Sequence, residues 1–392
     1  MFVGELALDG SVRPASGLLP MMLAARQHGV PAAVVPAANA REAALVPGVR
    51  IHPVRSLTDA VEIASGGEPR AHVVLPSAAL PRAVPDMADV RGQLLARRAL
   101  EVAAAGGHNL LLVGPPGSGK TMLARRLAGL LPPLASEESI EASAIHSAWG
   151  QPLESLLSER PFRSPHHTAS DIALVGGGAN PRPGEASLAH NGVLFLDELP
   201  EFRRRALEAL RQPLEEGHIE IARARSALRL PARFQLVAAM NPCPCGFRGD
   251  RRRACACTPR QIAAYQGRVS GPLLDRIHLQ VAVQALSYAE LTGRDGEASA
   301  SIAARVRAAR AVQEQRGVCN RELRGAQLRA VATQDPGAAG LLANAIDRLG
   351  LTARAHDRLL RVARTVADLE GSERVAARHI GEALQFRGAT DE

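Results

Sequence analysis

The chain has 392 residues, is 46% apolar and carries a formal charge of +8, with aromatic residues at only 3%. This length predicts two or three domains, and the apolar fraction favours buried cores over wholesale disorder. Apolar runs break well before about 18 residues and the start has no basic leader, so we expect no membrane span, no signal peptide and a cytoplasmic location.

The excess of positive charge favours a polyanionic partner such as nucleic acid. The alternative is that it reflects only the abundance of arginine throughout the chain. Because aromatic residues are scarce, any nucleic acid is expected to be held mainly through its phosphates and not by base stacking.

Residues 1–66 predict a small α/β unit, in which short apolar runs alternate with helical patterns. We expect strands over 2–8, 32–35 and 49–54, and helices over 18–28 and 57–64. A stretch rich in glycine and proline follows, which predicts a linker over 67–90.

The most informative motif is Gly-Pro-Pro-Gly-Ser-Gly-Lys-Thr at 114–121. It lies between an apolar run and a helical pattern, which is the strand–loop–helix context of a phosphate-binding loop. Lys120 is expected to reach the outer phosphates of a nucleoside triphosphate, and Thr121 to hold Mg²⁺. The predicted nucleotide-binding residues are Gly114, Pro115, Pro116, Gly117, Ser118, Gly119, Lys120, Thr121 and Asp197.

Two further apolar strands end in polar residues. The first, over 193–196, precedes Asp197 and Glu198, and the second ends at Asn241. Asp197 can hold Mg²⁺ opposite Thr121, and Glu198 can act as the general base on an attacking water. Asn241 is expected to orient that water or to contact the γ-phosphate.

The alternation of strands and helices over 91–287 predicts a parallel sheet with helices on both faces. From residue 288 to 392 the strand signals disappear. We therefore expect an α-helical lid after the sheet domain.

The stretch 161–189 is expected to be a flexible insert that includes Arg163 and three consecutive glycines. Its neighbouring histidines, His166 and His167, would point to opposite faces of an extended chain, which disfavours a shared metal. A hairpin predicted over 219–230 offers Arg223, Arg225 and Arg229, which contact either DNA phosphates or only solvent.

Four of the five cysteines form two tight pairs, Cys243 with Cys245 and Cys255 with Cys257. Four thiolates suit tetrahedral Zn²⁺, but the pairs are closer together than in most zinc sites. A structural zinc and a loop of reduced cysteines are the two alternatives.

The chain resembles, over nearly its whole length, the Mg-chelatase-like branch of the AAA+ ATPases and its ComM/YifB type. Besides the phosphate-binding loop, the resemblance is carried by Phe-Arg-Ser-Pro-His-His at 162–167, the stretch 183–198, Asn-Pro-Cys-Pro-Cys-Gly at 241–246 and the stretch 270–277. It implies an AAA+ core in a homo-oligomeric ring, a hexamer, with ATP bound between subunits.

The resemblance also implies roles for single residues. Asn241 corresponds to sensor 1, Arg276 to the arginine finger given to the neighbouring subunit, and Arg354 to sensor 2. His278 stands where the family has aspartate, which puts a local salt bridge in doubt.

The N-terminal unit resembles the second half of a Lon-protease-type domain, so we expect an N-terminally truncated form. Leu19 stands at the position of the catalytic lysine of Lon proteases, and the segment with the nucleophilic serine is missing. Peptidase activity is therefore disfavoured.

As to function, the resemblance favours an ATP-driven DNA motor, such as a branch-migration helicase in recombination and natural transformation. One alternative is the ATPase subunit of a chelatase that inserts Mg²⁺ into a porphyrin. Another is an AAA+ regulator that remodels protein partners.

Overall fold

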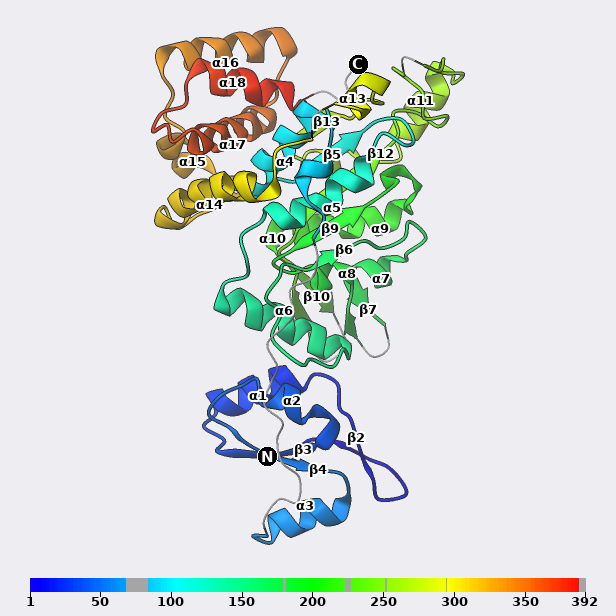
Figure 1. Ribbon diagram of the computed structural model, residues 1–392, viewed down its shortest axis with the longest axis vertical. Coiled ribbons are helices and arrows are strands. Elements are labelled where there is room, and N and C mark those ends of the chain that lie inside the picture. The colour runs from blue at the N-terminus through cyan, green and yellow to red at the C-terminus, as the bar shows by residue number, and fades with distance from the viewer. Residues whose placement is uncertain (68–83, 179–180, 223–226, 251, 294, 388–392) are drawn as a thin grey trace.

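The computed structural model describes residues 1–67, 84–178, 181–222, 227–250, 252–293 and 295–387. At its centre is a parallel five-stranded sheet (Figure 1) with the strand order β13-β5-β12-β9-β6. The strands are Leu279–Ala282, Leu110–Val113, Gln235–Met240, Val193–Leu196 and Phe162–Arg163 in that order. All carboxyl ends of the strands therefore lie along one edge.

Both faces of the sheet are buried, which explains the continuous apolar runs. Leu110 and Leu112 of β5 belong to the core that α4 (Leu94–Gly106), α5 (Lys120–Leu130) and α14 (Ser299–Gln315) help to form. Leu111 and Val113 point into the opposite core, with α7 (Asp171–Val175), α8 (Glu185–Leu188) and α9 (Arg204–Ala209). The predicted sheet with helices on both faces is confirmed.

The remaining elements of this region cap the sheet or project from it. They are α6 (Ser136–Trp149), β7 (Gly176–Gly177), β8 (Arg182–Pro183), α10 (Arg211–Glu216), β10 (His218–Ala222), β11 (Ala227–Pro231), α11 (Pro259–Gln266) and α12 (Gly271–Leu274). The strands β7 and β8 pair with each other, as do β10 and β11, and both pairs are antiparallel.

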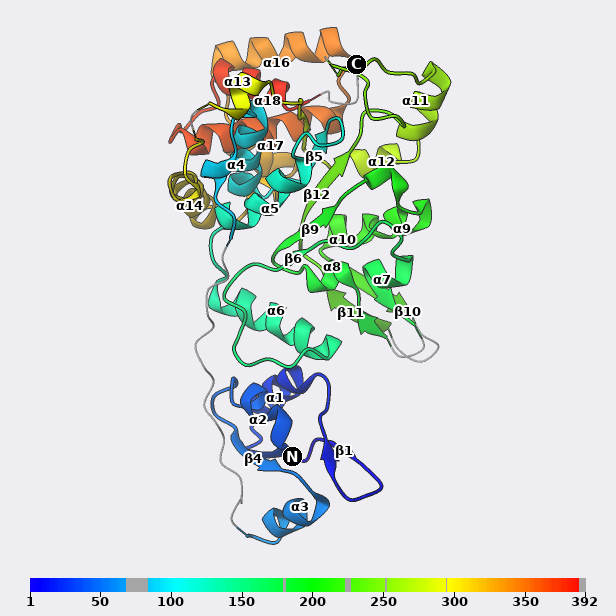
Figure 2. The same cartoon turned by 45° about the vertical axis from the view of Figure 1, so that its right-hand side comes forward.

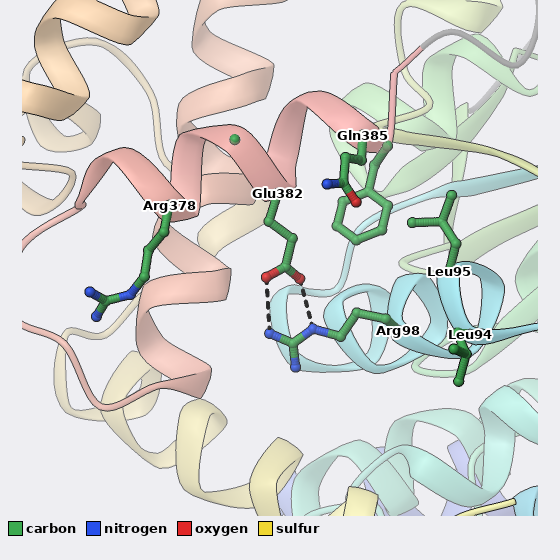
Figure 3. Close-up of a pocket in the computed structure, with 8 residues that line it drawn as sticks. Leu94, Leu95, Arg98, Arg378, Glu382 and Gln385 are labelled. Carbon is green, nitrogen blue, oxygen red and sulfur yellow. Dashed lines mark hydrogen bonds and ion pairs between the residues drawn. The ribbon is translucent and has the colours of Figure 1, made fainter.

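The described residues after the sheet form helices, as expected. They are α13 (Tyr288–Leu291), α14, α15 (Gly325–Val331), α16 (Pro336–Leu349), α17 (Ala353–Leu369) and α18 (Ala377–Gln385). Figure 3 shows how α18 is held to α4: the Arg98 guanidinium donates to Glu382 from Nε at 2.7 Å and from a terminal nitrogen at 3.4 Å. In the part of the chain that the structure describes, no helix combines the length and apolarity needed to cross a bilayer.

The N-terminal unit lies at the opposite end of the molecule from these helices (Figures 1 and 2). It consists of β1 (Glu5–Leu6), β2 (Val12–Arg13), α1 (Leu18–Gln27), β3 (Ala32–Pro36), α2 (Ala40–Ala43), β4 (Arg50–Val54) and α3 (Leu57–Ala64). The strand expected over 2–8 is shortened to two residues, because the chain turns back at Asp9 and Gly10 to pair β1 with β2. The strands β3 and β4 are parallel.

The N-terminal unit packs against α6 of the sheet region. The backbone N–H of Leu19 donates to Ser147 Oγ at 3.2 Å and to Glu42 Oε1 at 3.3 Å, and the Ser147 hydroxyl donates to the same carboxylate. All three residues are buried. Leu153 of the sheet region also belongs to the apolar core of this unit.

Candidate nucleotide site

The run 114–121 connects the carboxyl end of β5 to α5. Gly117 and Gly119 have positive φ angles of 75° and 91°, which glycine adopts without strain. A Cβ at Gly114 would lie 2.1 Å from the carbonyl oxygen of Val283, so only glycine fits there. Ser118 Oγ is buried and has no hydrogen-bond partner among the described residues. This geometry fits a loop that binds phosphate oxygens.

Lys120 is folded over this loop. Its Nζ donates to the carbonyl oxygens of Gly114 at 2.8 Å and Pro115 at 2.9 Å, and to Asn241 Oδ1 at 3.2 Å. Burial lowers the pKa of Lys120, and the charges of Asp197 and Glu198 oppose that shift. The ammonium therefore lies between the loop and Asn241, where it can meet the outer phosphates of a nucleotide.

A set of oxygen atoms suited to Mg²⁺ lies at the start of α5. Thr121 Oγ1 donates to Asp197 Oδ2 at 2.6 Å, and Asp197 Oδ1 accepts the backbone N–H of Glu198 at 2.9 Å. Hydroxyl and carboxylate oxygens are the hard ligands that Mg²⁺ prefers. The residues present thus fit the ion that accompanies a nucleoside triphosphate.

Glu198 occupies the left-handed region, with φ 54° and ψ 46°. A non-glycine residue in this region is uncommon and often marks a functional site. Its carboxylate pairs with His167 Nδ1 at 3.0 Å. The stretch 161–189 therefore touches the predicted general base, a role for His167 that the sequence did not indicate.

The expectation that His166 and His167 point to opposite faces is wrong. Their rings lie side by side, with centroids 4.1 Å apart. The chain turns here instead of running extended, and His166 Nδ1 is 2.9 Å from Thr168 Oγ1.

Gln93 is a second residue at the loop that the sequence did not reveal. It has a positive φ of 50° just before α4. Its side-chain amide donates to the carbonyl oxygens of Gln284 at 2.6 Å and Ser118 at 3.4 Å. The only sequence signal was the adjacent glycine, Gly92, which also has a positive φ, of 58°.

The structure places Arg276 and Arg354 together. Arg276 pairs with Glu215 and donates to the carbonyl oxygen of Pro272 at 3.3 Å, and Arg354 lies 3.6 Å from Asp275. Burial, and then the nearby charge of Arg354, lowers the pKa of Arg276.

The two arginines lie at the amino edge of the sheet, opposite the phosphate-binding loop. The carbonyl oxygen of Arg276 accepts the side-chain amide of Asn109, which immediately precedes β5, at 2.8 Å. Lys120 follows the other end of that strand. The four residues of β5 span about 13 Å, more than an arginine side chain can reach.

The four clustered cysteines lie next to Asn241. Their Sγ atoms are all within 4.8 Å of one another. The distances from Cys243 are 3.4 Å to Cys245 and 3.6 Å to Cys255, and Cys245 is 3.6 Å from Cys255. The fifth cysteine, Cys319, lies elsewhere and donates to the carbonyl oxygen of Gly106 at 3.1 Å.

The hairpin expected over 219–230 is present as β10 and β11. Arg229 is exposed and its guanidinium lies 3.0 Å from His218 Nδ1. Arg223 and Arg225 lie outside the described residues. Arg163, on β6, is paired with Glu185 through two contacts of 2.7 and 2.8 Å.

Comparison with known families decides the class of this protein. Residues 86–291 match the family described as magnesium chelatase, subunit ChlI, and residues 296–387 match the C-terminal region of the same subunit. Residues 1–39 match a further model, subunit ChlI of Mg-chelatase. The chain belongs to the magnesium chelatase ChlI family.

Its curated relatives indicate the branch. Competence protein ComM of Haemophilus influenzae is 45% identical over 396 residues, covering 98% of this chain and 77% of the relative. YifB of Escherichia coli is 45% identical over 391 residues, covering 98% of this chain and 76% of the relative. The magnesium-chelatase 38 kDa subunit of Cereibacter sphaeroides is 25% identical over 328 residues, covering 74% of this chain and 86% of the relative. The chain is thus a Mg-chelatase-like protein of the ComM/YifB type, and its sheet fits the P-loop AAA+ fold.

Proposed function

We propose that this protein hydrolyses ATP as a ring of identical subunits, a hexamer, with each ATP site shared between two copies. The observation that supports this most strongly is the separation of Arg276 from Lys120 across the sheet. An arginine at the amino edge cannot reach the nucleotide of its own subunit. The Arg276 side chain is partly exposed there, beside Glu215, where a neighbouring subunit could meet it. Arg354 is beside it and serves the same neighbouring site.

Within one subunit the residues have distinct tasks. The loop N–H groups and Lys120 hold the phosphates, and Thr121 and Asp197 hold Mg²⁺, which neutralises charge on those phosphates. Glu198 takes a proton from the attacking water, and Asn241 orients that water. Arg276 from the neighbour offsets charge that develops during transfer, an effect worth ~10³–10⁵ in rate in other nucleotide hydrolases.

DNA is the proposed substrate of the ring, with branch migration in recombination and natural transformation as its use. The formal charge of +8 supports a polyanionic partner. The hairpin of β10 and β11 directly precedes β12, which ends next to Asn241, and His167 contacts Glu198. The stretch 161–189, which the family resemblance implies lines the pore of the ring, and the hairpin are the two elements that we propose to contact DNA. Both are connected to the catalytic residues.

The second candidate is a chelatase-type ATPase subunit, which the match to the Cereibacter sphaeroides subunit favours. ATP hydrolysis measured with and without branched DNA separates the two. We expect DNA to stimulate hydrolysis, and Lys120→Ala to remove both basal and stimulated activity. Hydrolysis in the wild-type chain that is indifferent to DNA would contradict the DNA motor and favour a chelatase or a protein-remodelling regulator.

A further inference from the structure

The four-cysteine cluster lies next to the phosphate-binding loop. Its geometry distinguishes a structural zinc site from a loop of reduced cysteines. In a tetrahedral zinc site with Zn–S bonds near 2.3 Å, neighbouring sulfurs are about 3.8 Å apart. The three measured separations, 3.4, 3.6 and 3.6 Å, are close to that value. Since all four sulfurs lie within 4.8 Å of one another, the site has the dimensions for one ion.

Backbone N–H groups point at the sulfurs. The N–H of Arg248 donates to Cys243 Sγ, that of Cys245 to Cys257 Sγ and that of Cys257 to Cys255 Sγ, each at 3.4 Å. Donors of this kind stabilise the negative charge that cysteine sulfurs carry when they bind a metal ion. A divalent cation held by all four sulfurs would in turn neutralise that charge.

The cluster is tied to the nucleotide site at two points. Cys243 is fully buried and stands two residues after Asn241, whose side chain accepts from Lys120. Gly246 has a positive φ of 85°, and a Cβ on it would lie 2.6 Å from Cδ of Pro116 in the phosphate-binding loop. The turn between the cysteines therefore packs directly on that loop.

We propose that Cys243, Cys245, Cys255 and Cys257 bind one structural Zn²⁺, and that this ion holds the segment following β12 against the phosphate-binding loop. The ion fixes Asn241 beside Lys120 and seats Gly246 on Pro116. Zinc would therefore raise the affinity for ATP without contacting the nucleotide. The effect of zinc on ATP affinity rests on the proposed nucleotide binding, whereas the zinc site itself does not.

The test uses the full chain purified without chelator. Elemental analysis should give one zinc per chain in the wild type, and none in the double variant Cys245→Ser with Cys257→Ser. Cys319→Ser is the matched control, because it removes a thiol outside the cluster, and should keep the zinc. A wild-type chain that holds no zinc, even after incubation with Zn²⁺ under reducing conditions, would overturn the site.

The coupling is measured by titration with a fluorescent ATP analogue, with circular dichroism to show that the fold is retained. We expect at least tenfold weaker binding in the double variant than in Cys319→Ser. Cys257→His, which replaces one zinc ligand by another, should keep both zinc and affinity. Equal affinity in the zinc-free variant and the control would refute the coupling. A wild-type chain that binds no ATP would refute the coupling and the proposed function together, while zinc content still decides the metal site.

Discussion

Two neighbouring histidines between the sheet and α17 illustrate how single residues affect the stability of this protein; His108 is fully buried and His278 is partly buried. The rings of His108 and His278 lie 5.0 Å apart, and both are surrounded by arginines. His108 Nε2 is 2.7 Å from Thr365 Oγ1, and His278 Nδ1 accepts the N–H of Asn109 at 3.3 Å. His278 stands where the family resemblance implies an aspartate, and its ring here accepts a backbone hydrogen bond.

We predict that these histidines make the protein acid-sensitive. Burial, and then the arginine charges, lowers the pKa of His278 to about 3, and burial lowers that of His108 well below its usual value. The unfolded chain binds these protons near pH 6.5, so the stabilisation is complete above that pH and is lost as pH falls toward 3. At pH 5 the depressed pKa of His278 costs ~2 kcal/mol of stability relative to pH 7, and the lowered pKa of His108 acts in the same direction.

Urea unfolding at pH 7 and pH 5 checks this prediction. His278→Asn keeps an acceptor for the Asn109 N–H but cannot be protonated in this range. It should therefore lose ~2 kcal/mol less than the wild type between the two pH values. An identical loss in both proteins would show that His278 does not determine the acid sensitivity.

Among the single residues of the candidate site, the sequence predicted those whose proposed role follows from a local motif. Lys120, Thr121, Asp197, Glu198 and Asn241 stand at strand ends or loop positions, and parallel strands bring those positions to one edge. His167 and Gln93 were missed because their contacts depend on turns and left-handed backbone angles that no local pattern encodes. The expectation that His166 and His167 point to opposite faces was wrong for the same reason.

Among the helices, α6 of the sheet region is the one against which the N-terminal unit packs. Ser147 on this helix accepts the N–H of Leu19 and donates to the buried carboxylate of Glu42. Sequence patterns predicted the helix that carries Leu19, on the N-terminal side of this contact, but did not identify α6. They could not predict the docking, because it depends on two side chains more than 100 residues apart in the chain.

Ser147→Ala should loosen this docking. The change removes a donor from a buried carboxylate, which costs ~1–3 kcal/mol. We expect faster proteolytic cleavage of the N-terminal unit, measured by the rate of release of its fragment. Ser136→Ala, on the exposed first residue of the same helix, is the control. Equal cleavage rates for the two variants would contradict a role for this contact.

For the whole molecule, the separation of Arg276 and Arg354 from Lys120 across the sheet is the central feature. The sequence placed both arginines in the ATP site only through family resemblance, since charge alone does not distinguish them among so many arginines. Under the proposed function, their position at the amino edge means that a second copy of the chain completes that site. Assembly and ATP hydrolysis are therefore expected to depend on each other.

Mixing two inactive variants tests this account most directly. Lys120→Ala lacks a working loop but retains Arg276, and Arg276→Ala has the reverse defect. If the arginine acts in the neighbouring subunit, equal amounts co-assembled should recover about a quarter of the wild-type ATP hydrolysis, because that share of interfaces combines an intact loop with an intact arginine. A mixture no more active than the two separate variants would contradict the shared site.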